Sequence, residues 1–223
     1  MTDYPIIFSP PMVRALLREV AQPGTGKTMT RRLAWRCPCE PGAPAHVCGA
    51  GGYAGWKSSI WAKVKPGDLL WVKEAIRFNP EHSNFYYEAD NKGVGDRVCA
   101  RLIEREKERG RPYVNLGGRY VPRFTTRLVL TVNGNKVEQP QDISAEDASA
   151  EGCQCLPCEG PHRGPEASYW TMDERSAAPI KRTTPFLAFK AFWEVLHSER
   201  GWEANPTVAA PSFTPALRDM EAV

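Results

Sequence analysis

Apolar and polar positions alternate over short distances along most of the chain, and only a few stretches have a helical pattern. Apolar residues recur at three- and four-residue spacing over 12–20 and 186–197, which predicts two amphipathic helices. The charged segment 96–108 repeats arginine every four residues and predicts a third helix. A short fourth helix is predicted over 144–152, with Ser144 as its N-cap.

Short runs of β-branched and aromatic residues predict strands at 4–8, 68–76, 85–89 and 123–132. The last of these runs, RFTTRLVLTV, is the strongest, and we expect a hairpin-type turn at 133–135 to end it. Residues 205–208 could begin a final strand, and the chain from 211 onward is expected to be loose.

Short strands combined with few helices indicate the α+β class, here a small β-barrel with flanking helices. Two segments rich in cysteine, glycine and proline, at about 34–60 and 153–180, are expected to be loop insertions. We expect one domain over 1–213 and a loose tail at 214–223. The 20 prolines and 18 glycines agree with a fold rich in turns rather than a helical bundle.

Composition narrows the class of protein further. Hydrophobic residues make up 42% and charged residues 25%, which argues against a wholly disordered chain. Apolar runs span only a few residues, so the sequence predicts no membrane span, no signal peptide and a cytoplasmic protein. A net charge of +3 neither requires nor excludes a nucleic-acid partner.

The string AQPGTGKT at 21–28 matches a P-loop if alanine may replace the first glycine. A P-loop follows a strand and opens a helix, whereas here a helix precedes the string and CPCEPG at 37–42 prevents a long helix after it. No hydrophobic strand ending in aspartate follows to hold magnesium. A nucleotide triphosphatase is therefore disfavoured.

Six blocks in a fixed order form the most specific pattern in the chain. They are the helix at 12–20, GKTMTRR at 26–32, KPGDLLWVKE at 65–74, PRFTTR at 122–127, QDISAEDASAEG at 141–152 and WEANP at 202–206. Together they resemble the ASCH family of PUA-like barrels, named after the activating signal cointegrator homology domain. The last three blocks resemble its longer phage and prophage members.

The resemblance implies a catalytic activity found in small bacterial members, removal of the acetyl group from N-acetylated cytidine. Carried over by motif, Thr30 would be the nucleophile, Lys27 the base and Glu151 the proton donor to the leaving amine. Arg32 could bind the carbonyl oxygen or a phosphate. Lys27 and Thr30 would share one side only on a helical turn or bulge, which predicts a non-extended backbone at 28–29. This chemistry requires no cofactor.

The same positions would also suit a passive pocket for a flipped base or an RNA end, or an RNA-cleaving nuclease. Residues 1–75 carry ten lysines and arginines against five acids, interleaved with tryptophan, which favours a nucleic-acid face. We therefore expect RNA or a modified nucleoside as partner, and a non-catalytic binding module stays open as an alternative. The substrate-binding candidates are Thr28, Arg31, Arg32, Trp71, Glu74 and Arg123.

Seven cysteines, an odd number, favour free thiols or metal ligands over a disulfide framework. The candidate ligands lie in the two loops, at Cys37, Cys39, Cys48, Cys153, Cys155 and Cys158. Each loop is one ligand short of the four that structural zinc needs, unless histidine contributes or both loops share one ion. Structural zinc and scattered reduced cysteines both remain open. A seventh cysteine, Cys99, is expected to be an ordinary buried thiol.

Overall fold

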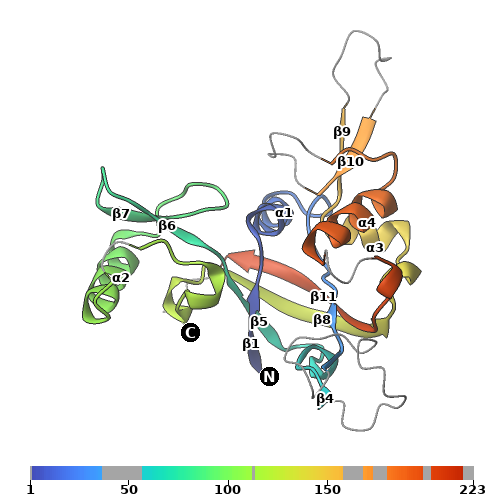
Figure 1. Cartoon of the computed structure of the whole chain (residues 1–223), viewed down its shortest axis with the longest axis horizontal. Helices are drawn as coiled ribbons and strands as arrows, with labels where there is room; N and C mark the ends of the chain where they lie inside the picture. The colour runs from blue at the N-terminus through green and yellow to red at the C-terminus, as the bar shows by residue number, and fades with distance from the viewer. Residues whose placement is uncertain are drawn as a thin grey trace.

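The computed structural model describes residues 2–36, 57–111, 114–157, 168–172, 180–197 and 202–217. Its main sheet has five strands in the order β1-β5-β8-β11-β2, and Figure 1 shows that this sheet is curled into a half-barrel. The strands are β1 (Asp3–Ile7), β5 (Leu69–Lys73), β8 (Leu128–Glu138), β11 (Val208–Leu217) and β2 (Arg32–Leu33). β1 and β5 are parallel, and all other neighbours are antiparallel. The α+β class is thereby confirmed.

The first helix, α1 (Pro10–Ala21), packs against this sheet. Val13 and Leu16 are fully buried in a core with Ile6, Leu70 and other residues of the sheet. Pro10 and Pro11 occupy the first helical turn, where a backbone amide would have no intrahelical partner. The helix predicted over 12–20 is therefore present and begins two residues earlier.

Two lobes flank the sheet, on opposite sides of α1 in Figure 1. One lobe contains β6 (Ile76–Asn79), β7 (Asn84–Tyr87) and α2 (Asp96–Glu108), packed around a core of their own. The other contains α3 (Ala145–Ala150), β9 (Gln154–Pro157), β10 (Ser168–Thr171) and α4 (Pro185–Leu196), with a third core. The remaining pair is β3 (Trp35–Arg36) with β4 (Lys57–Ser58). Short 3-10 helices lie at Trp61–Lys63, Gly118–Tyr120, Arg123–Thr125, Pro140–Asp142 and Trp202–Ala204.

All four predicted helices are present, but two strands differ from the prediction. The segment 68–76 is divided between β5 and β6, and β6 leaves the main sheet to pair with β7. The segment 123–132 begins with a 3-10 turn, and its strand starts at Leu128. The turn expected at 133–135 is wrong, because β8 continues through these residues to Glu138, paired with β11.

The C-terminal strand is the other departure from the sequence analysis. β11 pairs with β8 over its whole length and reaches Leu217, four residues beyond the expected end of the domain at 213. A bulge between Ser212 and Phe213 adjusts its register. Residues 218–223, and the central parts of both predicted insertions, lie outside the described residues. No described helix is long and apolar enough to cross a membrane.

Candidate functional site

The GKTMTRR segment is held by its backbone between three elements. The amide of Lys27 donates to the carbonyl of Ala15 in α1 at 3.0 Å. The amides of Thr28 and Met29 both donate to the last residue of α3, Ala150, at 2.8 and 2.9 Å. Further along, the segment pairs with β11 and becomes β2. The chain therefore crosses from α1, past the end of α3, to the edge of the sheet.

Two glycines allow this close approach. A Cβ on Gly26 would lie 2.3 Å from both the Ala15 carbonyl oxygen and the Glu19 nitrogen, so no other residue fits without moving the backbone. Gly152 has a φ of +105°, and its Cβ would lie 2.9 Å from the Cβ of Ala15. The start of the segment and the end of α3 are thus packed directly onto α1.

Lys27 and Glu151 meet at this crossing, although 124 residues separate them. The Nζ of Lys27 lies 2.6 Å from Oε2 of Glu151 and donates to its backbone carbonyl at 2.7 Å. Lys27 is fully buried, and Glu151 is 2% exposed. Burial lowers the pKa of Lys27, and the Glu151 carboxylate opposes this effect without cancelling it. The structure therefore brings together two of the three predicted catalytic residues.

Arg31 extends the cluster outward. Its guanidinium lies 3.0 Å from Oε1 of Glu151, 3.1 Å from Asp147 and 2.5 Å from Glu138. Lys136 contacts both Asp147 and Glu138. Sequence reasoning missed Asp147, although its place four residues before Glu151 puts both on one face of α3. Glu138, at the end of β8, has no comparable signal in the sequence.

Thr30 is the third predicted catalytic residue. It is 1% exposed, and the described hydrogen bonds of the Lys27 Nζ go to Glu151 rather than to the Thr30 hydroxyl. Among the described hydrogen bonds, none joins the nucleophile and the base proposed from the motif.

Met29 forms an isolated antiparallel bridge with Ser212. The amides of Thr28 and Met29 nevertheless both donate to the Ala150 carbonyl, whereas successive amides of a regular strand point to opposite edges. This hydrogen bonding agrees with the irregular backbone predicted at 28–29.

Arg32 closes the cluster at the edge of β1. Its guanidinium donates to the carbonyl of Ile7 at 2.7 Å and lies 5.2 Å from the ring centre of Phe8 and 5.9 Å from that of Trp61. Lys27 faces the same Phe8 ring at 5.7 Å. The Nε atoms of Arg31 and Arg32 are buried and have no hydrogen-bond partner among the described residues. We call Lys27, Arg31, Arg32 and Glu151 the Lys27 cluster.

The other three substrate-binding candidates make different contacts. Trp71 lies beside Arg123, with 5.8 Å between ring centre and guanidinium, and Arg123 is paired with Asp3. Glu74 is buried, and Arg127 holds both of its oxygens at 2.8 Å. The prediction that these residues join Lys27 in one site receives no support from these contacts.

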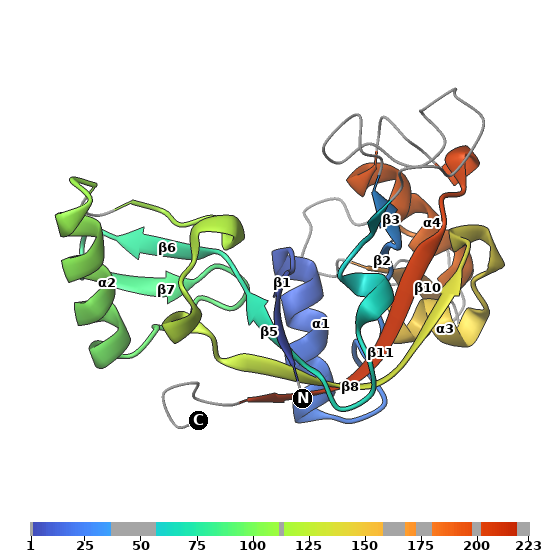
Figure 2. The ribbon, with the colours of Figure 1, turned by 90° about the horizontal axis from the view of Figure 1, so that it is seen from below.

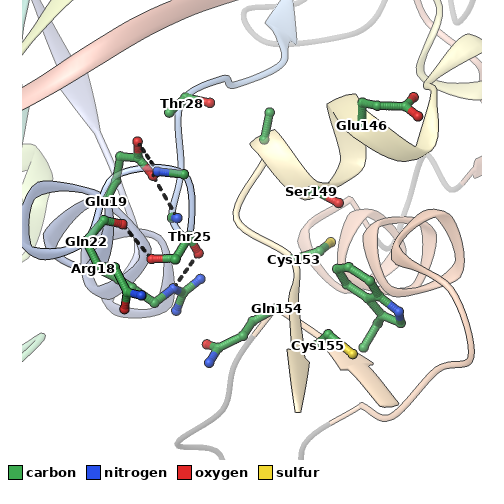
Figure 3. A pocket seen from close by; sticks show the side chains of 14 residues that line it. Arg18, Glu19, Gln22, Thr25, Thr28, Glu146, Ser149, Cys153, Gln154 and Cys155 are labelled. Atoms are coloured by element: carbon green, nitrogen blue, oxygen red, sulfur yellow. Dashed lines mark hydrogen bonds between the residues drawn. The ribbon is translucent and has the colours of Figure 1, made fainter. Parts of the chain in front are cut away.

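A cavity of about 660 Å³ opens between the end of α1, the end of α3 and the β9–β10 hairpin (Figure 3). Its lining includes Gly26 and Thr28, which flank Lys27 in the chain, and Ala150, which precedes Glu151. Arg18 donates to the carbonyls of Thr25 and Gly152 at 2.8 and 3.2 Å. The cavity therefore lies directly behind the backbone that carries the Lys27–Glu151 pair.

The candidate metal ligands are only partly described. Cys153 is buried, with its sulfur 3.0 Å from that of Met172, and burial raises its pKa to about 12. Cys155 is exposed, and Cys99 is half-buried rather than buried. Cys37, Cys39, Cys48 and Cys158 lie outside the described residues, within which no group of three metal-ligating side chains occurs. Zinc binding stays a prediction.

No protein-family model, curated protein or solved structure matches this chain. The ASCH resemblance stays a prediction carried by the six sequence blocks.

Proposed function

We propose that this chain is an RNA- or nucleoside-binding protein of the ASCH type with a PUA-like barrel. We propose further that its Lys27 cluster removes the acetyl group from N-acetylated cytidine. The observation that carries the proposal is Lys27, which is fully buried, has a lowered pKa and contacts the carboxylate that the motif comparison pairs with it. Perturbed, buried titratable groups of this kind concentrate at functional sites.

In the proposed reaction, the Thr30 hydroxyl attacks the acetyl carbonyl while neutral Lys27 takes its proton. The resulting intermediate collapses to an acyl-threonine, and the leaving amine takes the proton back from Lys27. Water then hydrolyses the ester and releases acetate. In this proposal Arg32 binds the developing oxyanion.

The geometry favours a different role for Glu151 from the one assigned by motif. Both of its oxygens accept hydrogen bonds, one from Lys27 and one from Arg31. We therefore propose that Glu151 positions these two cations and that Lys27 itself returns the proton to the amine.

Substrate access requires a local movement, because Lys27 is fully buried and Thr30 is 1% exposed. The cavity behind the 26–28 backbone has a volume within the range of ordinary ligand pockets, about 300–1,000 Å³. We propose that a shift of this backbone opens the Lys27 cluster to the cavity.

A non-catalytic binding module is the second candidate function. The observation that favours it is the missing contact between Thr30 and Lys27 among the described interactions. A binding module would use the buried donors of Arg31 and Arg32 to recognise a base or a phosphate and would need no nucleophile.

The test is to incubate the purified protein with N-acetylated cytidine and follow cytidine by chromatography. We expect conversion by the wild type and a loss of about 100-fold or more for Thr30→Ala and Lys27→Met, since each removes a reacting group. Thr125→Ala is the matched control. Thr125 is another buried threonine, and its hydroxyl donates to the Pro122 carbonyl at 2.8 Å, outside the Lys27 cluster. Its turnover should equal that of the wild type.

The alternatives give different results in the same assay. No conversion by folded wild-type protein rejects the hydrolase, and binding of the nucleoside without conversion supports the binding module. Cleavage of an RNA chain without release of acetate would instead indicate a nuclease. Equal losses in Thr30→Ala and Thr125→Ala would show that instability, not chemistry, causes the effect.

A further inference from the structure

The α2 lobe meets the main sheet beside β1 and β5 (Figure 2). Cations and aromatic residues of several elements lie near this boundary. The segment 118–123 crosses this boundary. A Cβ on Gly118 would lie 3.0 Å from the side chain of Ile7 in β1, and Lys73 donates to the carbonyl of Arg119 at 2.8 Å. On the other side, Arg105 of α2 approaches the carbonyl of Tyr120 at 3.5 Å.

We call this surface the basic junction. Its cations are Lys73, Arg105, Arg109, Arg111, Arg119 and Arg123, and its aromatic residues are Trp71 and Tyr120. Two acids face these cations. Glu106 is fully buried beneath Arg105, Arg111 and Arg109, at 2.5, 3.6 and 3.9 Å, and Asp3 pairs with Arg123. Glu104 and Glu108 of the same helix are exposed, and Glu108 lies one turn from Arg105.

Among the described residues, the six cations of the basic junction outnumber these four acids and leave an excess of positive charge. The side chains of Arg109 and Arg111 are 48% and 53% exposed. Burial and the nearby Arg109 lower the pKa of Arg105, and burial and Arg105 lower the pKa of Lys73. Both directions agree with cations that repel one another. A bound polyanion would relieve this repulsion.

The aromatic residues narrow the class of polyanion. The Trp71 ring lies 5.6 Å from the Nζ of Lys73 and 5.8 Å from the guanidinium of Arg123. Tyr120 is 61% exposed, which is unusual for a large aromatic side chain with an apolar ring. Cations that track a phosphate backbone, interleaved with rings on which bases stack, are typical of sites for single strands.

We infer that the basic junction binds a single-stranded nucleic acid, with phosphates on the arginines and an unpaired base on Tyr120. The inference goes beyond the proposed hydrolysis, because none of these side chains belongs to the Lys27 cluster. Ile7 links the two regions, since its side chain lies beside Gly118 and its carbonyl accepts from Arg32. A strand bound at the junction would therefore pass the Arg32 end of the Lys27 cluster.

The experiment measures binding of a fluorescent oligouridylate of about 15 nucleotides by anisotropy, at several salt concentrations. The test variant combines Arg109→Gln, Arg111→Gln and Arg119→Gln and leaves Arg105, the nearest of the three cations around buried Glu106, in place. The matched control combines Lys65→Gln, Lys92→Gln and Lys181→Gln, which removes the same charge from exposed positions elsewhere. Circular dichroism verifies that both variants are folded.

We expect the test variant to raise the Kd about 10- to 100-fold and to reduce the slope of log K against log salt by about 2, since each lost phosphate contact removes about 0.7. Tyr120→Ala should raise the Kd about fivefold or more with an unchanged salt slope, because stacking is not ionic. The control triple should stay within about twofold of the wild type.

Three results would overturn the inference. They are no binding of the oligonucleotide by the wild type, equal weakening in the test and control triples, or binding to phosphatidylserine vesicles in its place. Turnover of N-acetylated cytidine by the test triple separates the two proposals. If the test triple loses oligonucleotide binding but keeps its turnover, both proposals are supported. If the wild type binds the oligonucleotide through the junction but has no turnover, only the hydrolase is rejected.

Discussion

Two of the buried charge clusters in the described part of the chain differ in how completely their groups are paired. In the first, Arg127 lies between two carboxylates, with both oxygens of Glu74 at 2.8 Å and those of Asp90 at 2.9 and 3.0 Å. Its guanidinium also covers the ring of Tyr87 at 3.9 Å. Burial alone would lower the pKa of Arg127, but the hydrogen bonds to Glu74 and Asp90 raise it above its ordinary value.

The Lys27 cluster uses similar groups but leaves them less satisfied. Its lysine has a lowered pKa, and two of its arginines bury an Nε atom that has no described partner. An unsatisfied buried donor costs about 1–3 kcal/mol, so a cluster built only for stability would not keep two of them. The two clusters therefore differ in their buried donors: those of Arg127 are used, whereas the Lys27 cluster keeps two without a described partner.

Glu151→Gln gives the largest expected effect on stability. The substitution leaves Lys27 and Arg31 buried without their shared carboxylate, and breaking a buried pair costs about 3–5 kcal/mol. We expect that decrease in the free energy of unfolding, measured by urea denaturation with an unchanged m-value.

Asp90→Asn is the corresponding substitution in the Arg127 cluster, which consists of Arg127, Glu74 and Asp90. Arg127 would keep both contacts to Glu74, so the expected loss is about 1–2 kcal/mol. If the two substitutions destabilised the protein equally, the proposed difference between the clusters would be wrong.

Gly26→Ala tests the close approach on which only the Lys27 cluster depends. The added methyl would meet the backbone of α1 at 2.3 Å, and relieving such a clash costs about 3 kcal/mol. Gly24→Ala is the control, because its Cβ would meet nothing within 4 Å and only its positive φ is strained. We expect a loss of about 1 kcal/mol for that control. Equal losses in thermal or urea unfolding would show that strain at φ, and not contact with α1, explains both glycines.

Local patterns in the sequence predicted the helices well, because each buries one apolar face or begins at a recognisable cap. Ser144, for example, accepts from the amide of Asp147 at 3.1 Å, as an N-cap should. The prediction of a turn at 133–135 was wrong because long-range pairing outweighed the local sequence. The Asn-Gly-Asn sequence favours a turn locally, but ten residues of β11 pair with β8 and keep it extended.

The candidate site was predicted only in part, because its residues come from distant parts of the chain. Lys27 and Glu151 were named together because the ASCH resemblance carries a spatial relation that spacing alone does not contain. Glu74 and Trp71 were grouped with them because both lie in the block at 65–74, which is the next block of the ASCH resemblance along the chain. Their true partners, Arg127 and Arg123, lie about fifty residues away, and no local pattern indicates that contact.

The smallest expected effect is the contribution of Lys27 to the pH dependence of the free energy of unfolding. Burial lowers the pKa of Lys27 in the folded state below the 10.5 of an ordinary lysine, so the unfolded chain binds more protons between the two values. The free energy of unfolding should therefore rise with pH as 10.5 is approached from below, by at most about 1.4 kcal/mol per pH unit. Lys73 titrates in the same direction, so the quantity to measure is the difference between the wild type and Lys27→Met. Arg127 adds nothing in this range, because its pKa is raised. A difference curve that is flat or falls with rising pH would contradict a buried, destabilised charge on Lys27.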